Sequence, residues 1–421
     1  MSDVVIAGAG VVGICTALAL LAEGHRVTVV EPAEPGGDHA ASYGNGGWLG
    51  TASVVPMSLP GLWKKIPRYL LDPDGPLVIR AAALPGLAPW LARFIASGRS
   101  LEQVSQTARA LSALLHDAPG RHAALAQGAG VSDLIVESGL TYVYPSREAF
   151  EAEALAWQLR RAQQVIWREL DGDELRAHTP ALAPSYGFGI EVSSGGHCRD
   201  PGAYVAALAA LARSRGAVWV SGAATGFRVL GGRLRAVSVG PTEVPADFAV
   251  ISAGIDSARL ARAAGIRIPL ESERGYHVVL PAEEVSMRTP IMPSDGKMAV
   301  TQMAQGLRIS GQVELSSRVA EPDWRRADIL LRHAQRLFPS LAVPSSSERV
   351  PRWLGHRPST PDGLPVLGAC TPSGQVLCAF GHGHVGLASA PASAELISDL
   401  IAGRPPRIDP LPYRASRFGW V

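Results

Sequence analysis

Residues 4–31 read VVIAGAGVVGICTALALLAEGHRVTVVE, and this stretch decides the fold. Its first four residues are all apolar, which predicts a strand that is buried on both faces of a parallel sheet. The alanine- and leucine-rich run from Ile14 to Gly24 predicts a helix that ends at its glycine. Val27 to Val30 is a second apolar run of strand length. The order strand, helix, strand predicts a βαβ unit at the start of the chain.

The turn between this first strand and the helix carries the pattern G-x-G-x-x-G. Gly8 would permit the tight turn, Gly10 the close approach of a pyrophosphate, and Gly13 the packing of helix on strand. Val11 and Val12 lie at the helix N-terminus, where free N–H groups and the helix dipole attract phosphate. In this setting the pattern predicts a dinucleotide site. The alternative is a βαβ unit that binds no ligand.

An acidic residue, Glu31, ends the second strand 18 residues after the third glycine. A carboxylate at this distance accepts hydrogen bonds from both ribose hydroxyls and repels a 2′-phosphate. The residue therefore disfavours NADP, but the motif alone does not distinguish NAD from FAD.

Composition and charge exclude several other classes of protein. Lys and Arg number 39 and Asp and Glu 37, so the formal net charge of +2 provides no field for nucleic acid. The 421 residues suffice for about two or three domains. The apolar run Val4–Ala22 lacks the basic start of a signal peptide. We therefore expect a cytoplasmic protein with reduced thiols and no metal, because no C-x-x-C or comparable spacing occurs among Cys15, Cys198, Cys370 and Cys378.

A second glycine-rich segment follows soon after Glu31. Small residues there suit a backbone that passes close to a ligand and donates N–H groups to it. The candidate cofactor-binding residues of this segment are Ser42, Asn45, Gly46, Gly47 and Trp48. An ordinary glycine-rich loop is the alternative.

With these segments, the sequence resembles the FAD-dependent amino-acid oxidase and dehydrogenase superfamily, which includes D-amino acid oxidase, glycine oxidase and sarcosine oxidase. It is most similar to the bacterial D-amino acid dehydrogenase branch. The resemblance covers essentially the whole chain. It rests on residues 4–31 and on SYGNGGWLG (42–50), VVPMSLPGLWKKIPRYLLDPDGPLVIR (54–80), GHRPSTPDGLPVLG (355–368) and GHGHVGL (381–387).

The resemblance implies FAD, bound in an extended form with its adenine end over the first βαβ unit. It also implies transfer of a hydride from the substrate Cα to flavin N5, which gives an imine that water hydrolyses to a 2-oxo acid. The implied fold class is α/β, with a Rossmann-like FAD-binding domain and a second α+β substrate domain built on an antiparallel sheet.

We expect both domains to be discontinuous. The FAD-binding domain would comprise residues 1–47, 196–270 and 351–421, and the substrate domain 48–195 and 271–350. Strand-like segments at 275–280 and 307–311 fit the antiparallel sheet of the second domain. Helical spacing of apolar residues predicts one long helix from Leu101 to Ala126, and a further helix from Glu148 to Gln163.

Two more turns are implied to reach the flavin in relatives of this kind. One contains Ala253 and Gly254, after a strand at Asp247 to Ser252. The other opens the last long helix, whose N–H groups could stabilise negative charge on the flavin pyrimidine ring. An ordinary helix cap is the alternative, and its two histidines could contact the flavin or simply be packed. This turn consists of Gly381, His382, Gly383, His384, Val385, Gly386 and Leu387.

An amino-acid substrate presents a carboxylate, which the planar fork of an arginine binds with two parallel hydrogen bonds. Arg357 and Arg308 match arginines of the family motifs, and we favour Arg357. A surface ion pair is the alternative for either residue. Tyr276 and His277 are weaker candidates for hydrogen bonds to the carboxylate or the amine, and Tyr276 could be a core residue. A general base is not required if the amine binds in its neutral form.

The predicted partners are an amino-acid substrate and an electron acceptor, a quinone or the respiratory chain. Leu59 to Leu71 mixes basic and apolar residues and could lie on the inner face of the cell membrane. A helical elaboration of the substrate domain is the favoured interpretation. Where the D-amino acid dehydrogenase branch usually has a smaller or amide residue, Trp48 makes a cyclic substrate such as a proline derivative plausible.

Three alternatives to a D-amino or imino acid dehydrogenase remain open. An oxidase of the same fold would use O₂ and release peroxide. A flavin-binding subunit would be active only within a larger complex. A nicotinamide-dependent dehydrogenase fits least, because the turn at 381–387 resembles a flavin-binding segment.

Overall fold

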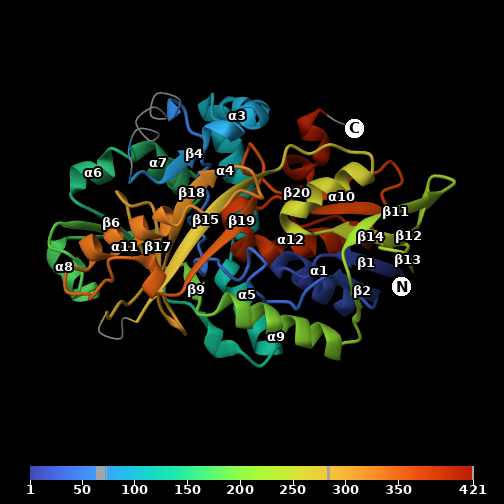
Figure 1. The fold of residues 1–421 in the computed structure, drawn as a ribbon, viewed down its shortest axis with the longest axis horizontal. Coiled ribbons are helices and arrows are strands. Elements are labelled where there is room, and N and C mark those ends of the chain that lie inside the picture. The colour runs from blue at the N-terminus through green and yellow to red at the C-terminus, as the bar shows by residue number, and fades with distance from the viewer. Residues whose placement is uncertain (63–71, 73, 282–284, 420–421) are drawn as a thin grey trace.

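The computed structural model describes residues 1–62, 72, 74–281 and 285–419. Most of the predicted amphipathic segment, residues 63–71, lies outside the described residues. Figure 1 shows two parts side by side, with β1, β2 and α1 in one and β15, β18 and α11 in the other. Within the described ranges, no helix is both long and apolar enough to cross a membrane.

The first part is built on a six-stranded sheet with the order β10-β2-β1-β14-β21-β20. β1 pairs in parallel with both β2 and β14, as buried apolar strands at the centre of such a sheet must. Only the edge strand β20 runs antiparallel, against β21. The strands are β1 (Asp3–Ala7), β2 (Arg26–Glu31), β10 (Val218–Ser221), β14 (Phe248–Ile251), β20 (Val366–Ala369) and β21 (Val376–Phe380).

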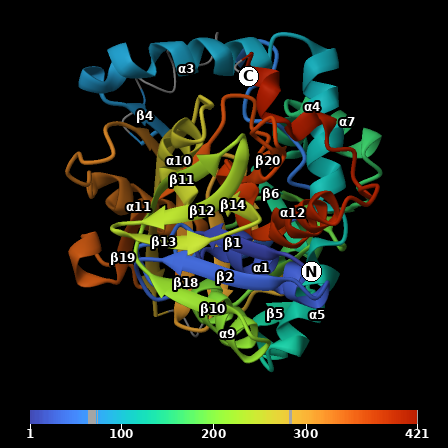
Figure 2. The same ribbon diagram turned by 90° about the vertical axis from the view of Figure 1, so that its right-hand side faces the viewer.

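Three helices, α1, α9 and α12, cover one face of this sheet, and a small antiparallel sheet together with α10 covers the other (Figure 2). The helices α1 and α12 pack closely against each other because α12 is rich in Ala and Ser. The small sheet buries Leu234 and Val237 against Val5 and Ile251. The elements are α1 (Val11–Ala22), α9 (Pro201–Ser214), α10 (Ser257–Ala263), α12 (Gly386–Ile401), β11 (Ala224–Leu230), β12 (Arg233–Val239) and β13 (Thr242–Pro245).

The second part is built on a nine-stranded sheet, in which β15 lies between β18 and β19 and is antiparallel to both. This confirms the antiparallel sheet that the sequence predicts. α11 packs on one face of the sheet. The elements are β4 (Leu77–Ile79), β6 (Leu140–Tyr144), β7 (Arg168–Leu170), β8 (Phe188–Val192), β15 (Glu271–Leu280), β16 (Ile291–Pro293), β17 (Ala299–Met303), β18 (Gly306–Leu315), β19 (Arg352–Ser359) and α11 (Arg325–Leu337).

Side chains alternate between the two faces of β15. Tyr276, Val278 and Leu280 pack in the core beneath α11. Glu273 and His277 point to the other face, because successive side chains of a strand project in opposite directions. We call this second face the site face, since it is turned toward the first part.

The remaining helices correct two predictions. The segment expected to form one helix from Leu101 to Ala126 is two helices, because Asp117 has a left-handed φ of 54° and Pro119 can only occupy a helix start. The segment from Glu148 to Gln163 is also divided, at Glu153, whose carboxylate accepts a hydrogen bond from the Tyr144 hydroxyl. The elements are α3 (Leu84–Ser97), α4 (Leu101–Leu115), α5 (Ala118–Gly128), α6 (Arg147–Glu151), α7 (Ala154–Ala162) and α8 (Gly172–His178).

A three-stranded sheet of short strands joins the two parts, in the order β3-β9-β5. These strands are β3 (Trp48–Leu49), β5 (Ile135–Val136) and β9 (Gly196–Cys198). The predicted domain boundaries stay a prediction. β19, which belongs to the segment 351–421, is nevertheless hydrogen-bonded into the nine-stranded sheet.

The core beneath α11 should carry much of the stability of the second part. Leu330 is fully buried there, whereas Leu230 at the tip of β11 is 62% exposed. Leu330→Ala should lower the free energy of unfolding by about 2–5 kcal/mol, because it removes buried apolar atoms and leaves a cavity. Leu230→Ala, the same chemical change at the surface, should change it by about 0.5 kcal/mol or less. Urea unfolding followed by tryptophan fluorescence measures both, and equal shifts for the two variants would contradict the assigned core.

Candidate active site

The glycine turn at the end of β1 leaves no space for side chains. A Cβ on Gly8, whose φ is +111°, would lie 2.4 Å from the carbonyl oxygen of Ser252 at the end of β14. A Cβ on Gly13 would lie 2.0 Å from the Gly8 carbonyl oxygen. The Ser252 hydroxyl donates to the carbonyls of Ala7, at 3.1 Å, and Gly8, at 3.2 Å. The turn is therefore fixed as a cradle of backbone at the N-terminus of α1.

Two side chains hold the start of α1 in the expected geometry. The Ala9 N–H donates to a Glu31 carboxylate oxygen at 2.7 Å, and the Val11 N–H donates to the Ser42 hydroxyl at 3.1 Å. Gly10 precedes the helix and has no side chain to cap it. The structure thus brings Glu31, Ser42 and the glycine turn together, as the sequence predicts of a dinucleotide site.

The loop that follows Ser42 is bound to the site face by side chains of the large sheet. The Arg308 guanidinium donates to the carbonyls of Tyr43, at 3.0 Å, and Asn45, at 2.9 Å. The Thr301 hydroxyl donates to the Gly46 carbonyl at 2.8 Å. Burial lowers the pKa of Arg308. This arginine is thus largely used to hold the loop.

Aromatic rings secure the same loop. A Cβ on Gly44 would lie 1.9 Å from the Trp353 ring, so only glycine fits at this point. His277 stacks on Trp353 with ring centroids 5.2 Å apart, and its Nδ1 lies 3.2 Å from the Gly44 carbonyl. Burial and then the Arg308 charge lower the pKa of His277 to about 3, although the contact with the Gly44 carbonyl acts in the opposite direction. His277 is therefore neutral and cannot offer a positive charge to a carboxylate.

Trp48 lies at the other end of the loop. Its Nε1 donates to the Thr301 hydroxyl at 3.1 Å, and its ring packs edge-on against Tyr142, with centroids 5.8 Å apart. Its side chain therefore fills the space between loop and sheet.

The turn at 381–387 reaches the site face through a histidine. A short 3₁₀ helix, Gly383–Val385, precedes α12. The His384 Nε2 lies 2.5 Å from a carboxylate oxygen of Glu273 on β15. His382, by contrast, is turned into α12, where its Nε2 meets the Ser393 hydroxyl at 3.0 Å and burial lowers its pKa to about 3.

Glu273 is a site residue that sequence reasoning missed. It is buried, with a side chain 8% exposed. Burial raises the pKa of the Glu273 carboxyl. The neighbouring His384, and after it Arg357, lower that pKa by more, so the net pKa lies below the ordinary value. The sequence offers one signal for Glu273: it lies two residues before Gly275, which puts its side chain on the same strand face as that of His277.

Arg357 stands directly opposite Glu273 on the neighbouring strand β19. Its guanidinium lies over Gly275, where a Cβ would be 2.2 Å from its Cζ. It donates to the Gln312 carbonyl at 3.1 Å. Burial lowers the pKa of Arg357, while Glu273 acts in the opposite direction. The carbonyl is available because Gln312 forms an irregularity in β18 with a left-handed φ of 59°.

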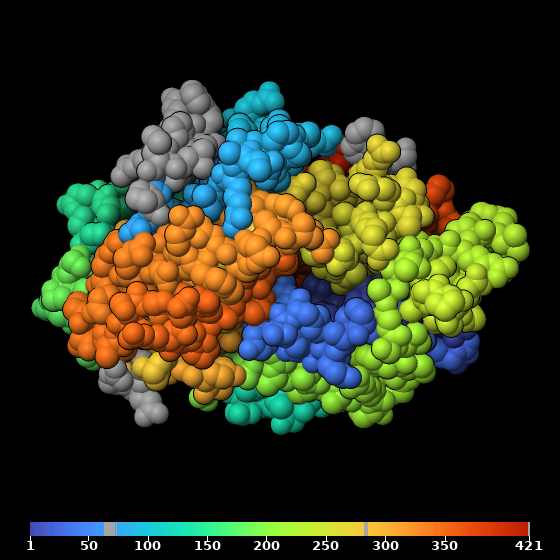
Figure 3. All heavy atoms as spheres, in the orientation of Figure 1, coloured from blue at the N-terminus to red at the C-terminus, as the bar shows by residue number. Residues whose placement is uncertain are grey.

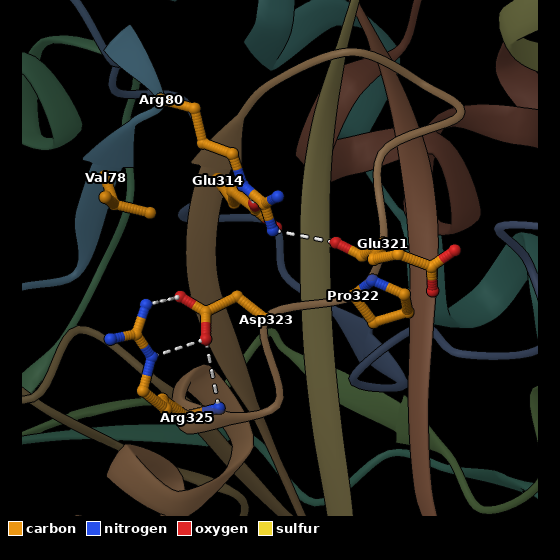
Figure 4. Close-up of a pocket in the computed structure, with 7 residues that line it drawn as sticks. All are labelled: Val78, Arg80, Glu314, Glu321, Pro322, Asp323 and Arg325. Carbon is orange, nitrogen blue, oxygen red and sulfur yellow. Dashed lines mark hydrogen bonds and ion pairs between the residues drawn. The ribbon is translucent and has the colours of Figure 1, made fainter. Parts of the chain in front are cut away.

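Tyr276 is separated from these residues. It lies on the opposite face of the sheet, where its hydroxyl donates to buried Glu314 and accepts from the Asp323 N–H at 3.0 Å. A cavity of about 430 Å³ borders this cluster (Figure 4). Two pairs of its charged side chains are ion pairs, Arg325 with Asp323 and Arg80 with Glu314. Glu314, which contacts Tyr276, lines the cavity from the face of the sheet opposite to the site face.

The surface of the molecule is hollowed where the glycine turn, the loop and the large sheet meet (Figure 3). Ala253 and Gly254 follow β14 at this edge of the first part. The buried Nε of Arg308 and the buried hydroxyl of Ser310 point from the site face without a partner in the described part of the chain. Buried polar atoms of this kind normally have partners, so they indicate space for a polar ligand.

Comparison with known proteins agrees with this geometry. The family described as FAD dependent oxidoreductase matches residues 3–400. A D-amino-acid oxidase of Bradyrhizobium diazoefficiens is 47% identical, over 99% of this chain and 98% of its own length. A D-amino acid dehydrogenase 2 of Ralstonia nicotianae is 32% identical, over 99% and 100%.

Solved structures share the fold at lower identity. Glycine oxidase from Geobacillus kaustophilus superposes with a TM-score of 0.72 at 21% identity, covering 99% of this chain and 98% of its own. L-proline dehydrogenase from P. horikoshii gives a TM-score of 0.73 at 17% identity, with the same coverage of both chains.

The residues present fit FAD. The backbone cradle at Gly8 and Gly13 suits a pyrophosphate, and Glu31 suits a ribose. The unpartnered groups of Arg308 and Ser310 lie where the polar ring of a flavin could reach them. No group of three or more potential metal ligands occurs among the described residues.

The cradle makes a direct prediction for cofactor binding. Gly13→Ala should remove most of the bound FAD, because the added methyl would collide with the Gly8 carbonyl. Gly226→Ala on β11 is the matched control, since a Cβ there meets no atom within 4 Å. The ratio of visible flavin absorbance to protein absorbance in the purified variants measures the effect. Full flavin content in Gly13→Ala would contradict the position of the cradle.

Proposed function

This chain belongs to the FAD-dependent oxidoreductase family, and on that premise we propose that it oxidatively deaminates a D-amino acid or a cyclic imino acid such as a proline derivative. Arg357 carries the proposal. Its guanidinium lies on the site face, opposite Glu273, and has a backbone carbonyl as a hydrogen-bond partner. A planar cation in this position suits the carboxylate that all such substrates share. The names of two relatives, a D-amino-acid oxidase and a D-amino acid dehydrogenase, support the D-configuration.

We assign the cofactor to four segments: the glycine turn with Glu31, the loop of residues 42–48, the turn at 253–254 and the turn at 381–387. When bound, FAD would supply the acceptor for a hydride from the substrate Cα, and hydrolysis of the resulting imine would give a 2-oxo acid. The glycine turn and Glu31 would hold the adenine end, and the three later segments the flavin end. The proposed contacts are Gly8, Gly10, Val11, Val12, Gly13, Glu31, Ser42, Asn45, Gly46, Gly47, Trp48, Ala253, Gly254, Gly381, Gly383, Val385, Gly386 and Leu387, with His382 and His384 beside them.

The chain itself has two tasks in this reaction. Arg357 would bind the substrate carboxylate and so aim the Cα–H bond, which reduces the entropic part of the barrier. The loop of residues 42–48, clamped by Arg308 and Thr301, would exclude water from the reacting atoms. His277 and Trp353 would act as supports of this loop.

The electron acceptor distinguishes two forms of the proposal. A dehydrogenase would pass electrons to a quinone or another component of the respiratory chain, from a cytoplasmic position or a peripheral one on the inner face of the membrane. An oxidase would pass them to O₂ and release peroxide. The relatives carry both names, so dioxygen is the second candidate.

The substrate class can be tested with the holoenzyme. D-alanine, D-proline or another D-amino acid should bleach the visible flavin band in the absence of oxygen, whereas the L-enantiomers should do so far more slowly. A panel of D- and L-amino acids, prolines and N-methyl glycine measures the rate for each. Peroxide formed per substrate oxidised under air separates oxidase from dehydrogenase. A flavin that no member of the panel reduces would contradict the proposal and favour a subunit that needs its complex.

The contribution of Arg357 to substrate binding should depend on its planar guanidinium. Arg357→Lys should raise KM by about 10- to 100-fold, the equivalent of about 1.5–3 kcal/mol for a hydrogen bond to a charged group. Arg352→Lys is the matched control, because Arg352 lies on the same strand and its guanidinium stacks over Trp324. Steady-state kinetics with the best substrate of the panel measures both, and an unchanged KM in Arg357→Lys would exclude this arginine.

A further inference from the structure

We infer that His384, oriented by Glu273, accepts the proton that the substrate's ammonium group must lose before oxidation, while Arg357 binds the carboxylate. This inference rests on the proposed function. It makes His384 a catalytic residue and Glu273 a positioning residue, although a general base is not required for substrates that bind with a neutral amine.

The geometry brings the three groups together from distant parts of the chain. Glu273 and Arg357 occupy directly opposed positions on β15 and β19, so both side chains project from the site face. His384 comes from the turn before α12 and places its Nε2 2.5 Å from the Glu273 carboxylate. Glu273 therefore lies between a group suited to a carboxylate and a group suited to an amine.

The exposure of the pair fits a role toward a ligand. The His384 side chain is 34% exposed, whereas that of Glu273 is 8% exposed. With Nε2 turned to the carboxylate, the second ring nitrogen, Nδ1, has no partner among the described residues. A carboxylate that accepts a hydrogen bond from Nε2 fixes the tautomer in which Nε2 carries the proton. The other ring nitrogen, Nδ1, then has a free electron pair. That nitrogen is the proposed proton acceptor.

The chemistry of the substrate creates the need for such an acceptor. At neutral pH the amino group is an ammonium, whose nitrogen has no electron pair to form a C=N bond. When one N–H bond breaks, the proton joins His384 Nδ1 and the electron pair stays on the substrate nitrogen. That pair then forms the C=N bond as the Cα–H bond breaks and its two electrons leave with the hydride to the flavin. Charge is conserved, because the proton that the ammonium loses is the one that the imidazole gains.

The charges around the imidazole support this role. From β15 it faces Glu273, with Glu271 two residues away on the same side of the strand, and from β19 Arg357 lies beyond Glu273. α12 carries no ionisable side chain before Glu395. The Glu273 carboxyl has a lowered pKa, so its negative charge is present to stabilise a protonated His384. The Glu273 carboxylate would offset one of the two positive charges, those of the protonated imidazole and Arg357, and the substrate carboxylate would offset the other.

A purely structural role for the pair makes different predictions. As a clamp between sheet and turn, the pair would affect flavin retention and thermal stability, but it would not change how the reaction depends on pH. The pH dependence of the reductive step is therefore the decisive readout.

The test uses the holoenzyme and the best substrate of the panel. In wild type, kcat/KM for anaerobic flavin reduction should have an acid limb that lies well below the pH at which the substrate amine loses its proton. In His384→Gln the rate at pH 7 should fall by about 100-fold or more, as for loss of a general base. Its acid limb should move up to the pKa of the substrate amine, so the rate should recover near pH 10. Added imidazole should restore part of the lost rate at pH 7.

Two further variants complete the design. Glu273→Gln should move the acid limb to lower pH, opposite to the shift in His384→Gln, with a smaller loss of rate, about 10-fold, because the imidazole remains but loses the anionic partner that stabilises its protonated form. If His384→Gln does not retain FAD, the pH profile of Glu273→Gln still tests the inference. His356→Gln is the matched control, since His356 adjoins Arg357 on β19 and is hydrogen-bonded to Ser272, at 2.7 Å, on the other face. Its pH profile should be that of wild type.

Binding of 2-aminoisobutyrate separates the inference from the proposed function. This amino acid has an ammonium and a carboxylate but no Cα–H, so it perturbs the flavin spectrum without reacting. Its affinity should fall about 10-fold in His384→Gln. Wild-type holoenzyme that neither binds it nor is reduced by the panel would overturn the proposed function and this inference together. Reduction with an unshifted acid limb in both His384→Gln and Glu273→Gln would overturn the inference alone.

Discussion

The backbone contact between Gly8 and Ser252 is the constraint on which the rest of this structure depends. The ends of β1 and β14 meet there with no room for a side chain, and the Ser252 hydroxyl bonds both Ala7 and Gly8. This contact fixes the direction in which α1 leaves the sheet. Because α12 packs along α1, it also fixes the turn that carries His384. The phosphate cradle and the histidine of the site thus share one geometric origin.

The second organising feature is the attachment of the 42–48 loop to the site face. Arg308, Thr301 and His277 all contact carbonyl oxygens of this loop, which belongs to the N-terminal part of the chain. Backbone carbonyls are obligatory acceptors, so a loop that crosses a buried face needs donors of this kind. Arg308 and His277, which the sequence suggests for substrate binding, thus largely serve to hold the two parts of the molecule together. Arg357 remains as the arginine on the same face that does not bind the loop.

Local features of this protein could be predicted from the sequence, and features that depend on register could not. The βαβ unit was predictable because its glycines, its strands and Glu31 all lie within residues 4–31. Tyr276 and His277 are neighbours in sequence, yet they face opposite sides of β15, and only the pairing with β18 and β19 reveals which side. Glu273 and His384 are 111 residues apart, so no local sequence pattern indicates their contact. Apolar spacing continues on both sides of Asp117, so the sequence predicts one helix where the structure has two.

The order of strands in the six-stranded sheet has a consequence for biosynthesis. β1 is among the first segments to be synthesised, but β21, which lies two strands away in the sheet, ends at Phe380. The sheet therefore cannot close until nearly the whole chain has left the ribosome, and contacts between such distant segments form slowly. Until then the apolar strands of the N-terminal unit lack their final cover. The pairing of β1 with β14 and of β14 with β21 is therefore among the last steps by which this sheet can be completed.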